Sequence, residues 1–255
     1  MSSLLVPARF RGPPSSGNGG WTAGAMAALL DRDRPHDQSW PAITVQLRQP
    51  PPLDVAMPVA EEDGWMVATH DDRPVARARL AEEDPAGVDP TSVDAARDAE
   101  PTYAGHTSHP FPTCFSCGVG RDEGDGLRIF PGRVADDDEG RVRVAATWTP
   151  DPSLAEDWHA VRDDVSHASL PVTWAALDCV GGWAGDLTER LMVLGTMTAR
   201  VDALPVIGEE HIVVGAAVGR EGRKSFTAAA LYDAGGRLVA SATHTWVAVD
   251  PKEFV

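Results

Sequence analysis

The sequence has 255 residues, of which 43% are hydrophobic and 24% are charged, and its formal net charge is −16 at pH 7. This composition is that of a globular protein long enough to bury a full core without disulfides or metals. The acidic excess argues against binding to nucleic acid and to anionic membranes, because both need a basic surface. The acidic net charge is still compatible with an anionic small ligand that a few arginines hold.

Two further classes are excluded by the pattern of apolar residues. No apolar run approaches the roughly 20 residues of a membrane-spanning helix. Residues 1–20 lack the basic start and apolar core of a secretion signal.

Three cysteines, Cys114, Cys117 and Cys179, make an odd count. Without an export signal, we expect reduced thiols and a cytoplasmic location.

The first part of the chain predicts one buried helix followed by four strands. Residues 8–12 are predicted as a short strand and residues 13–20 as a turn-rich loop. The segment WTAGAMAALL at 21–30 is apolar on all sides, which is typical of a buried helix. Alternating apolar and polar residues then predict strands at 43–48, 53–60, 64–70 and 74–81. Residues 82–107 have little periodicity and are interpreted as a linker.

The second part of the chain follows the same plan. Strands are predicted at 126–131 and 141–150. A second buried helix is predicted at 170–183 (LPVTWAALDCVGGW), with Ser169 or Leu170 as its cap and Pro171 at a position that tolerates proline. Four more strands are predicted at 194–204, 210–220, 223–233 and 237–249, with a hairpin turn at 235–236.

The two parts also share short sequences. Residues 43–47 (ITVQL) parallel residues 197–201 (MTARV), and residues 51–53 (PPL) parallel residues 205–207 (PVI). Chance similarity between amphipathic strands would explain the short matches alone. Because the order of one helix and four strands repeats as well, we favour an internal duplication.

A buried helix followed by an antiparallel meander, present twice, resembles the hotdog fold. In that fold a curved sheet wraps one long helix. The resemblance implies an α+β double hotdog with two long buried helices, each wrapped by a curved antiparallel sheet. The expected division is a first repeat with its trailing linker at 1–105, a connector containing Cys and His at 106–125, and a second repeat at 126–255.

The resemblance extends to hotdog thioesterases of the phenylacetate-pathway and small acyl-CoA type. Their central helix begins with His-Gly-Gly or Asn-Gly-Gly, and an acid follows about nine positions after the His or Asn. Here Asn18–Gly20 matches the first element, but Ala27 stands where the acid is expected. In the second half Asp178 matches the acid, whereas Ser169 and then residues 170–171 (LP) replace Asn-Gly-Gly. Each half therefore keeps one part of the motif.

In dimeric relatives the glycine donor and the acid of one site come from opposite subunits, so the resemblance implies one composite site in this chain. The amide of Gly19 or Gly20 would bind the oxyanion, because glycines at a helix start expose backbone N–H groups. Asn18 would orient the carbonyl or the attacking water, and Asp178 would act as general base or nucleophile. We expect an apolar channel between the two helices, lined by Trp21, Met26 and Trp174.

The same residues also fit a helix cap, a turn and a buried carboxyl that bonds a backbone N–H. The first functional hypothesis is hydrolysis of acyl-CoA or acyl-carrier thioesters without a cofactor. The alternative is a noncatalytic acyl or acyl-CoA binding protein on the same scaffold. The segment CFSCG before GDGLRIF also resembles uncharacterised actinobacterial proteins related to these thioesterases. A homodimer of double hotdogs is left open.

The connector has the residue types of a zinc site. His106, His109, Cys114 and Cys117 form the pattern H-x2-H-x4-C-x2-C, and such ligands suit tetrahedral zinc. One C-x2-C is a weak signal on its own, so we expect no metal, with His109, Cys114 and Cys117 as the candidate ligands. Cys179 follows Asp178 in a predicted buried helix and is assigned to the core.

Overall fold

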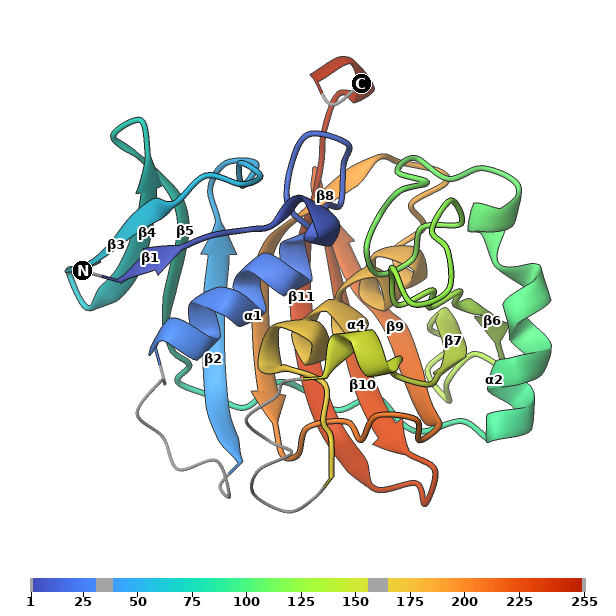
Figure 1. Cartoon of the computed structure of the whole chain (residues 1–255). Helices are drawn as coiled ribbons and strands as arrows, with labels where there is room; N and C mark the ends of the chain where they lie inside the picture. Colours follow the sequence, from blue (N-terminus) through green and yellow to red (C-terminus); the bar gives the residue numbers. More distant parts are fainter. Residues whose placement is uncertain (1, 31–38, 156–164, 254–255) are drawn as a thin grey trace.

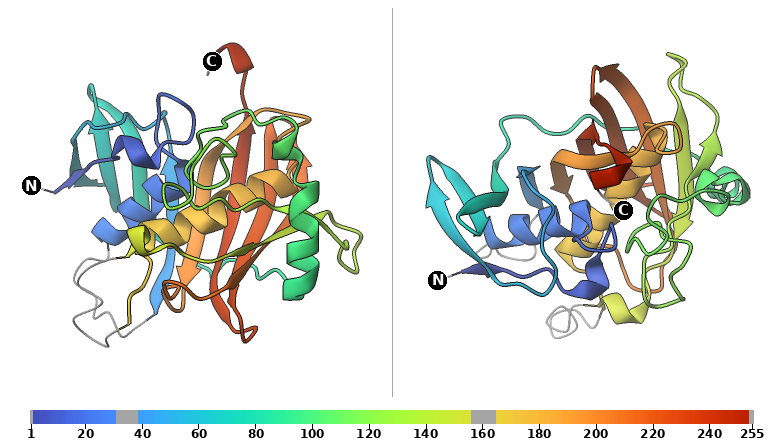
Figure 2. Two further views of the ribbon diagram at one scale, coloured as in Figure 1. Left: turned by 45° about the vertical axis from the view of Figure 1, so that its right-hand side comes forward. Right: turned by 90° about the horizontal axis from the view of Figure 1, so that it is seen from above.

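The computed structural model describes residues 2–30, 39–155 and 165–253. Within these residues a single antiparallel sheet of eleven strands runs in the order β1-β3-β4-β5-β2-β8-β11-β10-β9-β7-β6. Two long helices, α1 (Gly19–Leu30) and α4 (Leu170–Ala184), lie against one face of this sheet (Figure 1). Seen from above, the sheet curves around both helices (Figure 2).

The strands fall into two groups along the chain. The first group is β1 (Ser3–Leu4), β2 (Trp40–Leu47), β3 (Met57–Glu62), β4 (Trp65–His70) and β5 (Arg73–Leu80). The second group is β6 (Gly132–Val134), β7 (Arg143–Trp148), β8 (Met192–Val201), β9 (His211–Glu221), β10 (Lys224–Asp233) and β11 (Leu238–Ala248). Helix α2 (Val93–Ala99) and the 3₁₀ turns η1 (Ala8–Phe10), η2 (Glu100–Thr102), η3 (Ala104–His106), η4 (Pro152–Leu154) and η5 (Pro251–Glu253) complete the described elements.

The two groups share one topology. In each, four strands follow the long helix, and the sheet orders are β1-β3-β4-β5-β2 and β7-β9-β10-β11-β8. The second group has one additional strand before its helix, β6, which pairs with β7 at the edge of the sheet. The groups join where β2 pairs with β8, and there Thr44 lies opposite Thr198. Their hydroxyl oxygens are 2.8 Å apart. These threonines hold the same place in the repeated segments ITVQL and MTARV, so the join relates equivalent positions of the two groups.

Small residues let the two long helices touch. A Cβ on Gly20 would lie 2.4 Å from Asp178 Cβ and 2.8 Å from the Trp174 carbonyl oxygen. A Cβ on Gly24 would lie 2.6 Å from Pro171 Cα. As α1 advances from Gly20 to Gly24, its neighbour on α4 moves back from Asp178 to Pro171, so the helices run antiparallel. Glycine is required at this contact because any side chain would separate the helices.

Both helices begin with a side-chain cap. Asn18 Oδ1 accepts a hydrogen bond from the Trp21 amide at 2.8 Å, and Ser169 Oγ accepts one from the Val172 amide at 3.2 Å. The predicted cap at Ser169 is therefore confirmed. Such caps satisfy donors that the first helical turn leaves free. In the part of the chain that the structure describes, no helix is long and apolar enough to cross a membrane.

Two predicted strands are wrong. Residues 8–12 contain the 3₁₀ turn η1 rather than a strand. Residues 126–131 form no strand of the sheet, because the Leu127 and Ile129 amides donate to the carbonyls of Phe115 and Ser116. That segment thus runs beside the loop that carries Cys114 and Cys117 and is hydrogen-bonded to it.

The predicted linker at 82–107 is also more ordered than its composition indicates. It contains α2, whose first turn is capped by the Ser92 side chain. Helix α2 lies over β7 at one end of the molecule (Figure 1). The remaining predicted helices and strands are present with shifted ends; the strand expected at 53–60, for example, is β3 at Met57–Glu62.

Candidate functional site

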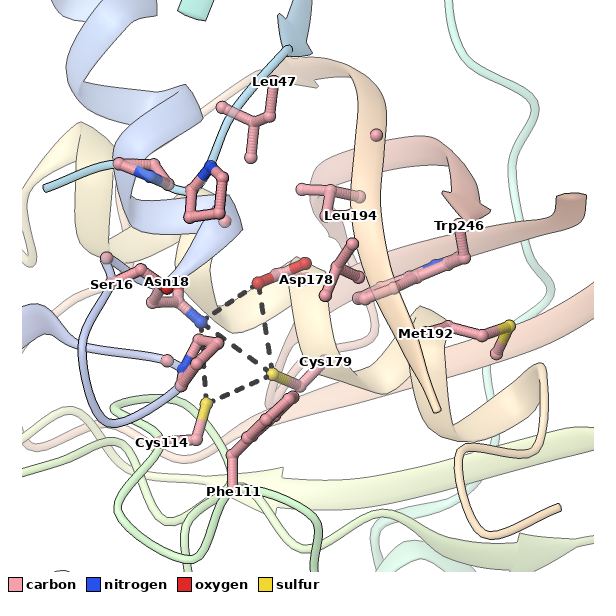
Figure 3. Close-up of a pocket in the computed structure, with 18 of the residues that line it drawn as sticks. Ser16, Asn18, Leu47, Phe111, Cys114, Asp178, Cys179, Met192, Leu194 and Trp246 are labelled. Atoms are coloured by element: carbon pink, nitrogen blue, oxygen red, sulfur yellow. Dashed lines mark hydrogen bonds between the residues drawn. The ribbon is translucent and has the colours of Figure 1, made fainter. Parts of the chain in front are cut away.

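The first turn of α1 and the middle of α4 meet at a buried carboxylate. Asp178 Oδ2 accepts hydrogen bonds from Asn18 Nδ2 at 3.0 Å and from the Gly20 amide at 2.9 Å. Asn18 and Asp178 are each 2% exposed. Figure 3 shows the two side chains pointing toward each other from the two helices. The structure therefore brings together Asn18, Gly20 and Asp178, which are 158 to 160 positions apart in the sequence.

The environment of Asp178 sets its chemistry. Burial raises the pKa of this carboxyl to about 7, against the opposing effect of the hydrogen bonds from Gly20 and Asn18. Its other oxygen, Oδ1, is buried and has no hydrogen-bond partner among the described residues. A buried carboxylate oxygen without a partner is costly unless it serves a ligand or water. The carboxyl is thus held through one oxygen and left unsatisfied at the other.

Some of the backbone amides at the start of α1 donate to protein side chains, whereas another has no acceptor. The Gly20 amide donates to Asp178, and the Trp21 amide donates to the Asn18 side chain. Gly19 opens the helix and lines the cavity described below, and its amide meets no acceptor within the described residues. At a helix N-terminus such a free N–H has the partial positive charge that binds an oxyanion. Of Gly19 and Gly20, Gly19 is therefore the residue whose amide is available to bind an oxyanion.

Three cysteine side chains lie beside Asn18 and Asp178. Cys114 Sγ lies 3.6 Å from Cys179 Sγ and 3.7 Å from Asn18 Nδ2. The three sulfur atoms of Cys114, Cys117 and Cys179 all lie within 4.8 Å of one another, and all three residues are buried. Cys179 Sγ is 4.0 Å from Asp178 Oδ2. The expected assignment of Cys179 to the core was incomplete, since its thiol also faces this polar corner.

The thiols perturb one another. Hydrogen bonds from the side chains of Cys117 and Cys179, supported by the backbone N–H groups of Cys117 and Ser116, hold the pKa of Cys114 well below its ordinary value. Burial raises the pKa of Cys117. The pKa of Cys179 is raised as well, first because its thiol proton is shared with Cys114. Cys114 is therefore the first of the three thiols to ionise.

His109 lies at the edge of the cysteine cluster. Its Nδ1 accepts a hydrogen bond from the Phe111 amide at 2.9 Å, so the proton of the neutral ring is on Nε2. Nε2 lies 3.1 Å from the Cys117 carbonyl oxygen, to which it donates, and 3.4 Å from Cys117 Sγ. His106 instead packs its ring against Tyr103 and Phe130. The four residues of the predicted zinc motif thus do not form a single cluster.

A cavity of about 350 Å³ opens in front of these groups. Asn18, Gly19 and Asp178 lie at its polar end beside the three cysteines. Apolar side chains form its walls, namely Leu47, Phe111, Met192, Leu194 and Trp246 (Figure 3) together with Leu187. This volume and this mixture of apolar walls with a few convergent polar groups are typical of small-molecule sites.

The expected channel residues do not line this cavity. Trp21, Met26 and Trp174 are 8%, 0% and 1% exposed and belong to the hydrophobic core. Trp21 stacks on Phe10 with the ring centroids 4.2 Å apart. The reason is the glycine-mediated contact between α1 and α4, which packs the two helices directly against each other. The cavity instead lies past the N-terminus of α1, against β8 and β11.

One pattern in the sequence indicated the cavity walls that were missed. Met192 and Leu194 alternate with other residues along β8, so they share one face of that strand. Alternation shows that a face is apolar but does not distinguish a core from a cavity wall. Trp246 carried the same ambiguity on β11.

No protein-family model and no curated protein matches this sequence. Several solved structures, however, are similar to this chain in fold. One is a conserved protein of unknown function with a hot dog fold from Alicyclobacillus acidocaldarius, 17% identical, with a TM-score of 0.58 over 96% of this chain and 92% of that one. Another is the tesB protein of Mycobacterium avium subs paratuberculosis, 11% identical, with a TM-score of 0.57 over 97% and 91%.

A third similar structure is the acyl-CoA thioesterase II TesB2 of Mycobacterium marinum, 9% identical, with a TM-score of 0.57 over 92% of this chain and 90% of that one. These likenesses span nearly the whole of each chain. The chain therefore has an α+β hotdog fold. The predicted resemblance to hotdog-fold thioesterases is confirmed at the level of the fold.

Proposed function

We propose that this chain hydrolyses acyl-CoA-type thioesters at one composite site between two hotdog repeats. The repeats are residues 1–105, with a trailing linker, and 126–255, joined by the connector at 106–125. The shared topology of the two strand groups and the pairing of Thr44 with Thr198 support a double hotdog. The names of the similar structures, which include acyl-CoA thioesterase II, support the activity.

One observation carries the proposal. The acid of the second half meets the Asn-Gly-Gly turn of the first, with Asp178 Oδ2 bound by both Asn18 and Gly20 at the end of a cavity. Each half alone lacks one part of this arrangement, since Ala27 is no acid and residues 170–171 are not glycines. A site that uses one element from each half explains why each half retains only one.

The geometry supports a role for each group. The thioester carbonyl oxygen would accept a hydrogen bond from the Gly19 amide, which stabilises the negative charge that forms as a water attacks. Asp178 would take a proton from that water through Oδ1, because Oδ2 is already held by two donors. The C–S bond then breaks, and the thiolate leaves with the proton returned from Asp178. Asn18 fixes the carboxyl in this orientation.

The cavity fits the acyl part of such a substrate. Its apolar walls would hold a hydrocarbon chain, whereas the polar end holds the reacting carbonyl. Arg48 is the one guanidinium among the lining residues of the described chain, and it would meet an anionic carrier such as the phosphates of CoA. Burial of an acyl chain contributes about 0.8 kcal/mol per methylene group.

The test is thiol release from a series of acyl-CoA substrates of short, medium and long chain length. Wild-type protein should hydrolyse at least one of them with saturation kinetics, and a decrease in KM with chain length should continue until the cavity is full. Parallel calorimetry measures binding of the same compounds. If the protein binds an acyl-CoA but releases no thiol from any chain length, it is a noncatalytic acyl-binding protein and the proposal fails. Failure to bind any of them refutes both.

A further inference from the structure

The three cysteines of the chain converge although they come from two separate segments. Cys114 and Cys117 lie in the loop before β6, and Cys179 lies in α4, 65 positions after Cys114. Their sulfur atoms nevertheless lie within 4.8 Å of one another. All three cysteines also line the cavity.

One pair of the sulfur atoms is too far apart for a disulfide and is spaced as two ligands of one metal ion would be. A disulfide requires sulfur atoms about 2.05 Å apart, whereas Cys114 Sγ and Cys179 Sγ are 3.6 Å apart. Tetrahedral zinc with Zn–S bonds of about 2.3 Å places its sulfur ligands roughly 3.8 Å apart. The observed distance between Cys114 Sγ and Cys179 Sγ is within about 0.2 Å of that sulfur–sulfur distance.

The loop that carries two of the thiols has a fixed shape. The Gly118 amide donates to the Cys114 carbonyl at 2.9 Å, which closes the turn C-F-S-C-G. A Cβ on Gly118 would lie 2.5 Å from the carbonyl oxygens of both Cys114 and Pro112, so this turn needs glycine. Ser116 Oγ donates to the Ala175 carbonyl at 2.8 Å and ties the turn to α4. The third thiol is thereby held at a set distance from the first two.

A hydrogen-bond donor lies beside two of the three sulfur atoms. Asn18 Nδ2 lies 3.7 Å from Cys114 Sγ and 3.9 Å from Cys179 Sγ. Such donors stabilise thiolates, and N–H groups around thiolate ligands are the usual outer shell of a metal site.

We infer that Cys114, Cys117 and Cys179 together bind one zinc ion as thiolates, with a fourth coordination position toward the cavity. All three ligands bind as thiolates, so each thiol that is still protonated releases its proton when the metal binds. His109 is not a ligand, because its Nε2 proton is donated to the Cys117 carbonyl. Asp178 is not one either, because its Oδ2 is bound by Asn18 and Gly20. The proposed set of ligands therefore contains Cys179 in place of the predicted His109.

The site differs in kind from a closed structural centre. Structural zinc sites use four protein ligands, whereas sites with three protein ligands keep one position for water or substrate. Here the metal would also link the connector to α4 beside the polar end of the cavity. Its loss should therefore loosen the loop around Cys114 as well as empty the site.

The experiment is metal analysis of the full chain purified in reductant without chelator. We expect about one equivalent of zinc, and thiols that react only after a chelator is added. The metal-free protein is then titrated with Co²⁺ alone. Three thiolate ligands should give a thiolate-to-cobalt charge-transfer absorption that saturates at about one equivalent. Neither measurement uses a thioester, so the result stands apart from that of the hydrolysis assay.

Variants locate the metal. Cys179→Ser should weaken Co²⁺ binding by more than about 100-fold, beyond the loss expected for an outer-shell partner. Thr113→Ala is the matched control, since it removes a hydroxyl from an exposed residue of the same loop and keeps all three thiols and the Ser116 tie, and it should retain the absorption. Wild-type protein with three freely reactive thiols and no charge-transfer band would overturn the inference. A disulfide between Cys114 and Cys179 in the intact mass, or stoichiometric iron or copper in place of zinc, would also overturn it.

Discussion

The two ends of the helix pair have the same backbone plan and different chemistry. At the N-terminus of α1, Asn18 and the Gly20 amide hold the carboxylate of Asp178, and a cavity lies in front of them. At the N-terminus of α4, Ser169 caps the helix and Pro171 packs on Gly24. One end is polar and open to a cavity, and the other is a packed helix start.

Single residues account for this difference. Pro171 has no N–H to donate, whereas the corresponding Gly20 amide holds Asp178. Ala27, nine positions after Asn18, is fully buried and apolar where Asp178, nine positions after Ser169, is an acid. The comparison teaches that packing between the helices is kept at both ends, whereas donors and an acid are present together at only one.

The largest effect is expected from restoring the missing acid alone. Ala27→Asp would place a carboxylate at a position with no exposure and with proline in place of the donor glycine. We expect a loss of roughly 3 to 5 kcal/mol of stability, as for an uncompensated buried charge, and no second site. Chemical denaturation measures the first and thiol release the second. Ala86→Asp, on an exposed loop residue, should be close to neutral. A stable Ala27→Asp protein with higher turnover would contradict the comparison.

The next effect concerns the close approach of the helices. Gly20→Ala would place Cβ 2.4 Å from Asp178 Cβ and 2.8 Å from a backbone oxygen. Overpacking against atoms that cannot move should cost about 3 kcal/mol of unfolding free energy. Gly87→Ala serves as control, because a Cβ there meets nothing within 4 Å, and it should change stability by less than about 0.5 kcal/mol. Equal stabilities of the two variants would show that the helices are further apart.

A third prediction compares corresponding positions on β5 and β11. Leu80 pairs with Ile43 and is exposed, whereas His244 pairs with Met197 and is buried. Burial lowers the pKa of His244 to about 4, from about 6.5 in an unfolded chain. Between these values the unfolded state binds the extra proton, so stability is full above pH 6.5 and falls as the pH drops toward 4, by up to about 3 kcal/mol.

His244→Leu, which copies the residue at the corresponding position, should remove that part of the pH dependence. Denaturation midpoints of both proteins from pH 7 to pH 4 measure the difference, and the opposite contribution of Asp178, whose pKa is raised, cancels between them. Parallel curves for the two proteins would show that His244 accepts a proton in the folded state.

The smallest effect is expected at the join between the two groups of strands. The hydroxyls of Thr44 and Thr198 form one partly buried hydrogen bond at 2.8 Å. Thr44→Val and Thr198→Val with the double variant form a thermodynamic cycle, and we expect a coupling energy of about 1 kcal/mol or less. Strictly additive losses would mean that the two groups are joined by the backbone ladder alone.

The sequence was most informative where periodicity or a cap determined the structure. Both long helices and the strands after them followed from apolar pattern, and Ser169 was a readable cap. The segment at 126–131 has a strand-like pattern too, but its amides pair with Phe115 and Ser116 in a loop. Pattern shows that a segment is extended without showing its partner. Helix α2 was missed because seven residues give little periodicity, although Ser92 was a usable cap signal.

The candidate site was only partly readable for a similar reason. Asn18 and Asp178 could be paired because the two halves were compared with each other. The third cysteine could not, since a separation of 65 positions between Cys114 and Cys179 resembles no ligand spacing. The cavity walls and the buried positions of Trp21 and Trp174 depend on how closely two glycine-bearing helices approach, and that distance is a property of the folded chain.

The central claim is that Asp178 acts on a thioester at the polar end of the cavity. The most direct measurement is kcat/KM for one acyl-CoA in wild-type protein, Asp178→Asn and the control Asp186→Asn. Asp186 follows α4, bonds Thr188, lies outside the cavity and has a positive φ that asparagine tolerates. Asp178→Asn should lose about 100-fold or more while still binding the acyl-CoA, and Asp186→Asn should behave as wild type. Hydrolysis by Asp178→Asn at the wild-type rate would contradict the account.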